Sequence, residues 1–387
     1  MREGWEYKKF DEVFNLQMGK TPNRKNPDYF GGKNVWISIR DLGDKEVLES
    51  NEHITDKAVS DTNIRKVKKG TVIMSFKLTV GKCGIAAKDL YTNEAIMAFN
   101  TKEGYDINSS FLYYYLQCYN WEGSNKAVMG ITLNKATISK QHINIPPKST
   151  QLAIVSELDK INELIRLKKE QLKDFDNLAQ SLFYEIFGDP VENEKGWEVK
   201  KLNEIVSDNC SISYGIVQPG DGIENGVPVV RPVDMTGTFV YRQGLKNTTK
   251  EISDSYKRTI LKGNEILMCV RGTTGLIAMA SSELRGCNVT RGITPIECGK
   301  SCNKWFIYYQ ISNSSIQQYI AEYTRGIALK QINMKDVRDI PLCLPPLPLQ
   351  QLFAHRIEQI EHQKSEVQKA ITDLETLLAS RMQYWFE

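Results

Sequence analysis

One short pattern in the sequence has the residue types of a metal-dependent nuclease. Asp189 precedes Glu198-x-Lys200, and nucleases of this kind cluster carboxylates around a metal, usually with a lysine nearby. The same Trp-Glu-x-Lys sequence occurs at residues 5–8, but there no aspartate precedes it. Because a short motif without its context is weak, we expect both copies to be the opening strand of a domain. An endonuclease remains the alternative.

The other residues that could do chemistry form no familiar constellation. The eight cysteines include no Cys-x-x-Cys pair, and Cys298 and Cys302 have no second pair or clustered histidine to complete a zinc site. No phosphate-binding glycine loop occurs, and residues 145–148 (IPPK) lack the asparagine and the aromatic residue of an amino-methyltransferase motif. We therefore expect reduced thiols, no metal, no cofactor and no catalytic residues.

Two similar loops combine a cation with hydroxyl groups. They are residues 75–81 (SFKLTVG) and residues 269–275 (CVRGTTG), in which Lys77 and Arg271 take equivalent places. A cation with hydroxyls on a loop that ends in glycine can contact DNA phosphates or the edge of a guanine. The predicted DNA-binding residues of these loops are Lys77, Thr79, Arg271, Thr273 and Thr274. The alternative is a solvated turn.

A second pair of loops gives weaker candidates for DNA contact. These loops are residues 129–135 and 325–330, and the candidates are Lys135, Arg325 and Lys330. The densest basic run, residues 65–69, precedes Gly70 and is better explained as an exposed turn. The adjacent tyrosines 113–115 are expected to pack a helix rather than to stack on bases.

The loops belong to a repeat of nearly 200 residues. Residues 4–10 (GWEYKKF) return as residues 196–202 (GWEVKKL), and residues 108–116 (NSSFLYYYL) are echoed by residues 303–311 (NKWFIYYQI). Three further short matches keep the same order. In each copy, short apolar runs broken by turn residues predict strands and turns, and an aromatic helix, a proline pair and a long helix follow. The chain is therefore predicted to contain a duplicated domain and a duplicated helix.

The two long helices are predicted from apolar residues spaced alternately by four and three. One such seam extends from Ile154 to Ile186 and the other from Phe353 to Trp385, with no proline or glycine inside. Each seam is about 33 residues long, or roughly 50 Å at 1.5 Å per residue. That exceeds the width of one small domain. We therefore expect the helices to pack on each other, antiparallel, as a spacer, rather than each on its own domain.

The charge and hydropathy of the sequence are those expected of a soluble protein that binds an acidic ligand. The net charge is +3, and the positive excess lies in residues 1–148 and 188–347 rather than in the helical segments. A basic balance in the two large segments is compatible with phosphate contact. No apolar run approaches the roughly 20 residues of a membrane span. Residues 1–20 contain no apolar core segment of a signal peptide, so a cytoplasmic protein without membrane contact is expected.

Several motifs resemble those of type I restriction-modification specificity subunits, over essentially the whole chain. Residues 181–190 (SLFYEIFGDP), continuing to Gly196-Trp197-Glu198, resemble the junction between the halves of such subunits. Three further segments are similar to the starts of target-recognition domains and of the second spacer helix: residues 19–22 with 36–42, residues 214–219 (YGIVQP) and residues 345–351 (PPLPLQQ). Residues 146–151 are a looser match to the start of the spacer helix.

The resemblance implies an α+β fold with a pseudo-twofold repeat. Two tandem mixed α/β target-recognition domains, residues 1–148 and 188–347, would be separated by two long antiparallel coiled-coil helices, residues 149–187 and 348–387. It also implies that each domain reads one half of a bipartite site in double-stranded DNA. The helices would dock two methyltransferase subunits, and restriction subunits would join the full complex. A protein-binding scaffold remains the other alternative, because nothing in the composition excludes it.

Overall fold

The computed structural model describes residues 2–121, 125–127, 130–220, 222–326 and 329–387. The chain divides into two compact units. Unit 1 contains residues 1–168 and 370–387, and unit 2 contains residues 169–369. Each unit thus holds one part of each long helix, and each is described by itself.

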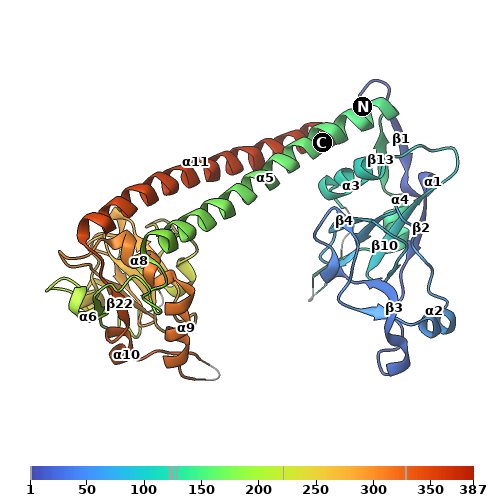
Figure 1. The fold of residues 1–387 in the computed structure, drawn as a ribbon. Helices are drawn as coiled ribbons and strands as arrows, with labels where there is room; N and C mark the ends of the chain where they lie inside the picture. Colours follow the sequence, from blue (N-terminus) through green and yellow to red (C-terminus); the bar gives the residue numbers. More distant parts are fainter. Residues whose placement is uncertain (1, 122–124, 128–129, 221, 327–328) are drawn as a thin grey trace. The chain divides into compact units, whose positions relative to one another are not determined.

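Unit 1 is built on small, mostly antiparallel sheets (Figure 1). The largest has the order β2 (Phe14–Met18), β10 (Ile96–Thr101), β6 (Val72–Ser75), β8 (Cys83–Ala86), β4 (Glu46–Val47). A second sheet has the order β5 (His53–Ile54), β3 (Phe30–Ile37), β9 (Tyr91–Thr92). A third has the order β11 (Asn125–Ala127), β12 (Gly130–Thr132), β7 (Lys77–Leu78). The last sheet pairs β1 (Glu6–Lys9) with β13 (His142–Ile145).

The helices of unit 1 are short apart from the long one. They are α1 (Phe10–Val13), α2 (Asp56–Thr62), α3 (Ser109–Cys118) and α4 (Lys135–Lys140), with 3₁₀ turns η1 (Pro27–Tyr29) and η2 (Ile39–Asp41). Helix α3 packs against β6 and β8 through an aromatic face in which Tyr114 and Tyr115 are buried. The expectation that the adjacent tyrosines pack a helix is confirmed.

Unit 2 repeats this plan. Its largest sheet has the order β16 (Phe239–Val240), β19 (Ile277–Ala280), β18 (Ile266–Cys269), β21 (Ile293–Ile296). A second sheet has the order β17 (Lys246–Thr248), β15 (Val227–Val230), β20 (Asn288–Val289). The third pairs β14 (Val199–Lys201) with β22 (Pro341–Cys343). Its short helices are α6 (Leu202–Ile205), α7 (Lys250–Asp254), α8 (Lys304–Ser312), α9 (Ser314–Tyr323) and α10 (Met334–Arg338), with 3₁₀ turns η3 (Pro232–Asp234), η4 (Lys257–Thr259) and η5 (Ser282–Leu284). Helix α8 contacts β19 in this unit, as α3 contacts β6 and β8 in unit 1.

The repeated Trp-Glu-x-Lys motif opens both sheet pairs, as the sequence predicted. Glu6 pairs with Ile145 at one end of the β1–β13 ladder, and Glu198 accepts a backbone hydrogen bond from Leu344 (2.8 Å) just before β14. In each copy the strand that opens the repeat therefore closes against the strand that ends it. This pairing places the start of the long helix, α5 or α11, directly after the sheet.

The two long helices are α5 (Lys148–Phe187) and α11 (Leu347–Phe386). Their four-three apolar residues are buried or half-buried. Ile154 and Leu158 on α5 are buried, for example, whereas Leu172 and Phe175 are half-buried. In unit 2 the helices are antiparallel neighbours, because Asp176 contacts Lys364 whereas Phe187, further along α5, contacts Phe353, which comes earlier on α11. The predicted helix pairing is confirmed there.

The ends of the helices also pack on the globular parts. Near its end, α5 buries Phe183 and Phe187 in the core of unit 2, where their rings lie 5.8 and 4.7 Å from the ring of Phe306. In unit 1, the ring of Phe386 on α11 lies 5.8 Å from that of Phe111 on α3. The long helices are thus both a seam and part of each core.

The last turn of α11 lies beside the first residues of the chain. The guanidinium carbon of Arg2 lies 5.4 Å from the ring of Trp5 and 5.3 Å from the ring of Trp385. Glu157 on α5 accepts hydrogen bonds from Arg381 and from the indole of Trp385 (3.0 Å). The second long helix therefore ends near Trp5.

Candidate nucleic-acid interface

In each unit, one edge of the sheets is formed by loops that follow strand ends. Strands β3 and β9 are parallel, as are β15 and β20, so the residues after them emerge at the same edge. We call these surfaces the loop edges. The loop edge of unit 1 consists of residues 18–21, 38–41, 76–81, 93–95 and 130–135, and that of unit 2 of residues 214–218, 231–234, 270–275, 290–292, 325–326 and 329–332.

Backbone hydrogen bonds make each loop edge continuous. In unit 2, Thr290 donates to Val230 (2.9 Å), and Val270 donates to Gly292 (2.7 Å). In unit 1 the matching bonds join Asn93 to Ile37 (2.9 Å) and Phe76 to Ala95 (2.9 Å). The same bonds recur at the same places of the repeat, so positions of the two edges can be compared one by one.

On each loop edge, a glycine allows a further segment of the chain to pack closely against the backbone of a strand. A Cβ at Gly215 would lie 2.2 Å from the carbonyl oxygen of Val289, and a Cβ at Gly19 would lie 2.2 Å from that of Thr92. Only glycine fits such an approach to strand backbone, since a side chain there would displace the strand. Tyr214 and Met18, which precede these glycines, are thereby fixed at the edges.

In unit 2, the structure brings the two predicted loops together. Arg271 is bridged to Gln331, and Gln331 exchanges two backbone hydrogen bonds with Arg325 (both 2.8 Å). Gly272 donates to the carbonyl of Lys330 (2.8 Å), and the hydroxyls of Thr274 and Thr324 lie 3.2 Å apart. The candidates Arg271, Thr273, Thr274, Arg325 and Lys330 therefore share one surface.

In unit 1, the equivalent loops also pair. Lys77 in β7 is opposite Thr132 in β12, and Leu133 donates to the carbonyl of Phe76 (2.8 Å). Next to Lys77, Leu78 is 58% exposed and has a left-handed backbone (φ 64°), a conformation that stores strain and occurs often at binding loops. Thr79, the remaining candidate here, is exposed.

The second predicted loop of unit 1 ends earlier than the sequence indicated. Lys135 is the first residue of α4, and Asn134 caps that helix by accepting from the backbone of Thr137 (2.8 Å). Lys135 is exposed, but it belongs to a helix rather than to the loop. Met129, also assigned to this loop, and residues 327–328 of the matching loop lie outside the described residues.

The cations of the unit 2 edge carry unused hydrogen-bond donors. Within the described part of the chain, Arg271, Arg291, Arg325 and Lys330 form no ion pair, and Nε of Arg271 is buried without a hydrogen-bond partner. Arg231 differs, because it binds Asp234 through two hydrogen bonds (2.7 and 3.0 Å) that raise its pKa. The unpaired arginines are available to a ligand that accepts hydrogen bonds.

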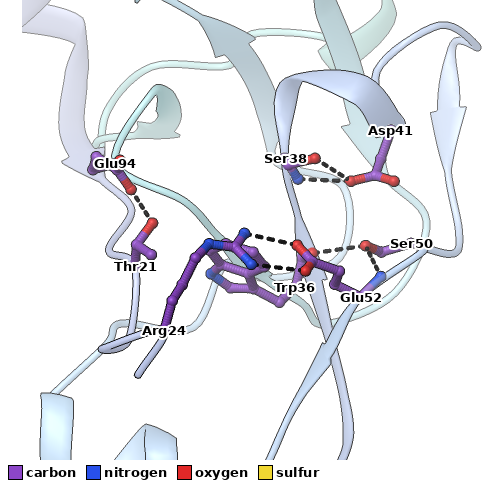
Figure 2. Close-up of polar contacts among 8 residues, drawn as sticks. All are labelled: Thr21, Arg24, Trp36, Ser38, Asp41, Ser50, Glu52 and Glu94. Carbon is purple, nitrogen blue, oxygen red and sulfur yellow. Dashed lines mark hydrogen bonds and ion pairs between the residues drawn. The ribbon is translucent and has the colours of Figure 1, made fainter. Parts of the chain in front are cut away.

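Unit 1 has carboxylates at its edge and beside it (Figure 2). Figure 2 shows Arg24 bound to Glu52 by two hydrogen bonds (2.8 and 2.9 Å), with its guanidinium over the ring of Trp36, while Thr21 donates to Glu94. The hydrogen bond from Arg24 holds the pKa of Glu52 below its ordinary value. Arg24 is thus already paired, like Arg231 of unit 2 but unlike Arg271 and Arg291.

Asp41 fixes the shape of the unit 1 edge. Its carboxylate accepts from the backbone and the hydroxyl of Ser38 (both 2.8 Å), which closes the turn after β3. Burial opposes the charged form of Asp41, but these hydrogen bonds outweigh it and lower the pKa. Asp234 closes the same turn in unit 2 through the backbone of Arg231 (2.8 Å). The turn is therefore a structural device that both edges share.

Sequence reasoning missed Arg291 and Gln331. Arg291 is the second residue after β20 and lies over the ring of Tyr214, and Gln331 donates to the hydroxyl of that tyrosine (3.3 Å). Arg291 was detectable in principle, because the repeat aligns it with Glu94. Its contact with Tyr214 was not, because the two residues are far apart in the sequence.

The residues of the nuclease-like pattern have structural partners. Asp189 accepts from the hydroxyl of Ser315 (2.5 Å) and from the backbone of Val191 (2.8 Å), while Glu198 lies 3.3 Å from Lys200. In the described residues, no group of three or more His, Cys, Asp or Glu side chains is arranged to hold a metal. Over the same part of the chain, no helix has both the length and the apolar character to span a bilayer.

Comparison with known proteins gives one consistent family. The sequence model described as "Type I restriction modification DNA specificity domain" matches residues 2–174 and again residues 194–376. The type I restriction enzyme MjaIX specificity subunit of Methanocaldococcus jannaschii is 24% identical over 96% of this chain and 90% of that protein.

Two solved structures share the fold. One is a chain from a study of complex assembly and conformational transition of the type I R-M system, with a TM-score of 0.62, 16% identity and coverage of 100% of this chain and 98% of that chain. The other is the type I restriction-modification S subunit from M. genitalium, with a TM-score of 0.53, 14% identity and coverage of 99% and 96%. Both extend over both repeats.

Proposed function

Because this chain belongs to the family of type I restriction-modification specificity subunits, we propose that it selects the DNA sequence on which such a complex acts. Each unit reads one half of a bipartite site through its loop edge. The observation that carries the proposal is the pair of equivalent loop edges, in which Lys77 and Arg271 recur at the same place beside a second loop. Two similar surfaces in one chain suit a ligand that presents a similar groove at each turn.

The candidate residues divide by their chemistry. Arg271, Arg325 and Lys330 offer charged donors to phosphates or base edges, and Thr273 and Thr274 offer hydroxyls on the same surface. In unit 1, Lys77 and Thr79 take this role, and Lys135 supplies a charge from the start of α4. The chain itself needs no catalytic residue for this function, because the reactions belong to the partner subunits.

The long helices are the proposed docking surface for two methyltransferase subunits, with restriction subunits in the full complex. They carry exposed leucines that are not used in the seam, among them Leu164 and Leu167 in unit 1 and Leu178 in unit 2. Exposed apolar side chains on a rigid helix are typical of interaction surfaces. The helices also act as the spacer that sets the gap between the two half-sites.

Methylome sequencing tests this function. The chain is expressed with the methyltransferase genes of its host, and the modified positions of the genome are mapped. A single bipartite motif that disappears when the chain is omitted is the expected result. Binding of the purified complex to duplex DNA without any sequence preference would support the protein-binding scaffold instead, and DNA cleavage by the chain alone would support the endonuclease.

A further inference from the structure

Four residues from four separate segments form a cluster on the loop edge of unit 2. The guanidinium carbon of Arg291 lies 5.7 Å from the ring centre of Tyr214, whose hydroxyl accepts from Gln331 (3.3 Å). Gln331 is in turn bridged to Arg271 through the backbone. The two arginines are therefore held on one surface by contacts that leave their charged ends without a carboxylate.

The cluster is rigidly built. Arg291 donates its backbone N–H to Ile216 (2.7 Å), and Ile216 donates to Val289 in β20 (2.8 Å). Gly215 permits this close approach, so Tyr214 and Arg291 are both fixed to the end of a strand. Side chains held at strand ends read a ligand more selectively than side chains on free loops, because their geometry is set before binding.

The donors of the cluster lack acceptors. Nε of Arg271 is buried without a partner, and buried polar groups in folded proteins are nearly always hydrogen-bonded. Among the described residues, neither Arg271 nor Arg291 forms an ion pair, whereas the neighbouring Arg231 is satisfied by Asp234. A ligand with adjacent acceptors would complete the cluster.

We infer that Arg291, held in place by Tyr214 and flanked by Arg271, reads a guanine in the half-site bound by unit 2. The inference rests on the proposed function. Guanine presents two neighbouring acceptors, O6 and N7, which match the two parallel donors of a guanidinium. A phosphate contact alone needs no such restraint of the side chain, since charge acts over a range of geometries.

The equivalent position in unit 1 argues for a difference between the half-sites. Glu94 stands where unit 2 has Arg291, and Met18 stands where unit 2 has Tyr214. A carboxylate accepts hydrogen bonds and repels the acceptor edge of guanine. The proposed guanine contact therefore belongs to unit 2 and is not shared by unit 1.

Selection of duplex DNA from a random library tests the inference, with the full chain and the methyltransferase subunits of its host. For Arg291→Gln, we expect one guanine position in one half-site to lose its preference by about five- to 150-fold, because a bidentate pair discriminates by about 1–3 kcal/mol. The other half-site should be unchanged. Arg291→Lys keeps the charge, so it should still bind random DNA, but its preference for the same guanine should weaken, because an ammonium lacks the fixed pair of donors of a guanidinium.

The matched control is Arg285→Gln. Arg285 is exposed and precedes β20, whereas Arg291 follows it, so this variant removes the same charge from the other end of the strand. It should leave the selected motif unchanged. If the wild-type complex selects no motif, the proposed function fails. If it selects a motif that neither Arg291 variant alters, the function stands and the guanine reader is wrong.

Discussion

The ammonium group of Lys364 on α11 lies 2.7 Å from the carboxylate of Asp176 on α5, within a seam that is otherwise largely apolar. Lys364 also binds Glu361 (2.9 Å), and the side chains of these two residues are only 16% and 11% exposed. Burial disfavours the charged form of Lys364, but the hydrogen bonds to both carboxylates outweigh burial and raise its pKa. A charged pair in a seam fixes which residues face each other.

Removal of Lys364 should destabilise unit 2 more than removal of its exposed partner. Lys364→Ala leaves Glu361 as a poorly solvated carboxylate, and we expect a loss of about 3 kcal/mol in the free energy of unfolding. Asp176 is 57% exposed, so Asp176→Asn should cost less than about 1 kcal/mol. Urea denaturation measures both variants. Equal losses would mean that Glu361 does not depend on Lys364.

The contact between Glu157 and Arg381 predicts a dependence of stability on pH. The hydrogen bond to Arg381 holds the pKa of Glu157 below its ordinary value. The stabilisation is therefore present above the unfolded pKa, about 4.3, and is lost as the pH falls through the lower folded value. Glu157→Gln should reduce stability at pH 7 by at most about 1 kcal/mol and flatten the profile below pH 5. Thermal melts between pH 3 and pH 7 provide the measurement, and a wild-type-like profile would rule out this contribution.

Gly215 should not tolerate a side chain. In Gly215→Ala, the new Cβ would meet the carbonyl oxygen of Val289, so the segment before β15 must move, at about 1–3 kcal/mol. Tyr214 would move with it, and DNA binding should weaken. Gly237→Ala is the matched control, because a Cβ at Gly237 has no atom within 4 Å. Melting temperature and gel-shift affinity are measured for both variants. If the two variants behave alike, the close approach of Gly215 to Val289 is unimportant.

Alanine substitution of the two equivalent cations should affect different half-sites. Arg271→Ala should weaken readout of the half-site bound by unit 2. If two guanidinium N–H groups of Arg271 contact one guanine, the loss in binding free energy should be about 1–3 kcal/mol. Lys77→Ala should act in the same way on the other half-site. The readout is the methylation motif of cells that express each variant. Unchanged methylation and affinity would remove the residue from the set of DNA contacts.

Helix length should set the gap between the half-sites. Adding one heptad to both α5 and α11 preserves the four-three seam and lengthens each helix by about 10 Å. We expect the gap in the methylated motif to grow by roughly three base pairs, at about 3.4 Å per base pair, with both half-site sequences unchanged. The far half-site also turns around the DNA by nearly a third of a helical turn, so activity should fall.

A heptad added to α5 alone should destabilise the protein, because it shifts the register of the seam. A functional double insertion that keeps the original gap would show that the helices are not the spacer.

Much of the architecture is local information and is therefore readable in the sequence. The spacing of residues such as Ile154 and Leu158 reports which face of a helix is buried, because the helical period relates neighbours three and four residues apart. The repeated Trp-Glu-x-Lys motif marked the opening of each sheet pair, and the aromatic run at residues 108–116 marked a packed helix. The repeat itself needed only a comparison of the chain with itself.

The surface that we propose to bind DNA depended on the tertiary structure. Arg271 and Arg325 were separate candidates in the sequence, and hydrogen bonds through Gln331 join their loops only in the folded chain. Likewise, the placement of Arg291 over Tyr214 and the ion pair of Lys364 with Asp176 join residues far apart in sequence. Local periodicity states which face of an element is buried, but not which distant segment covers it. That choice is made by the packing and hydrogen-bond pairing of the whole chain.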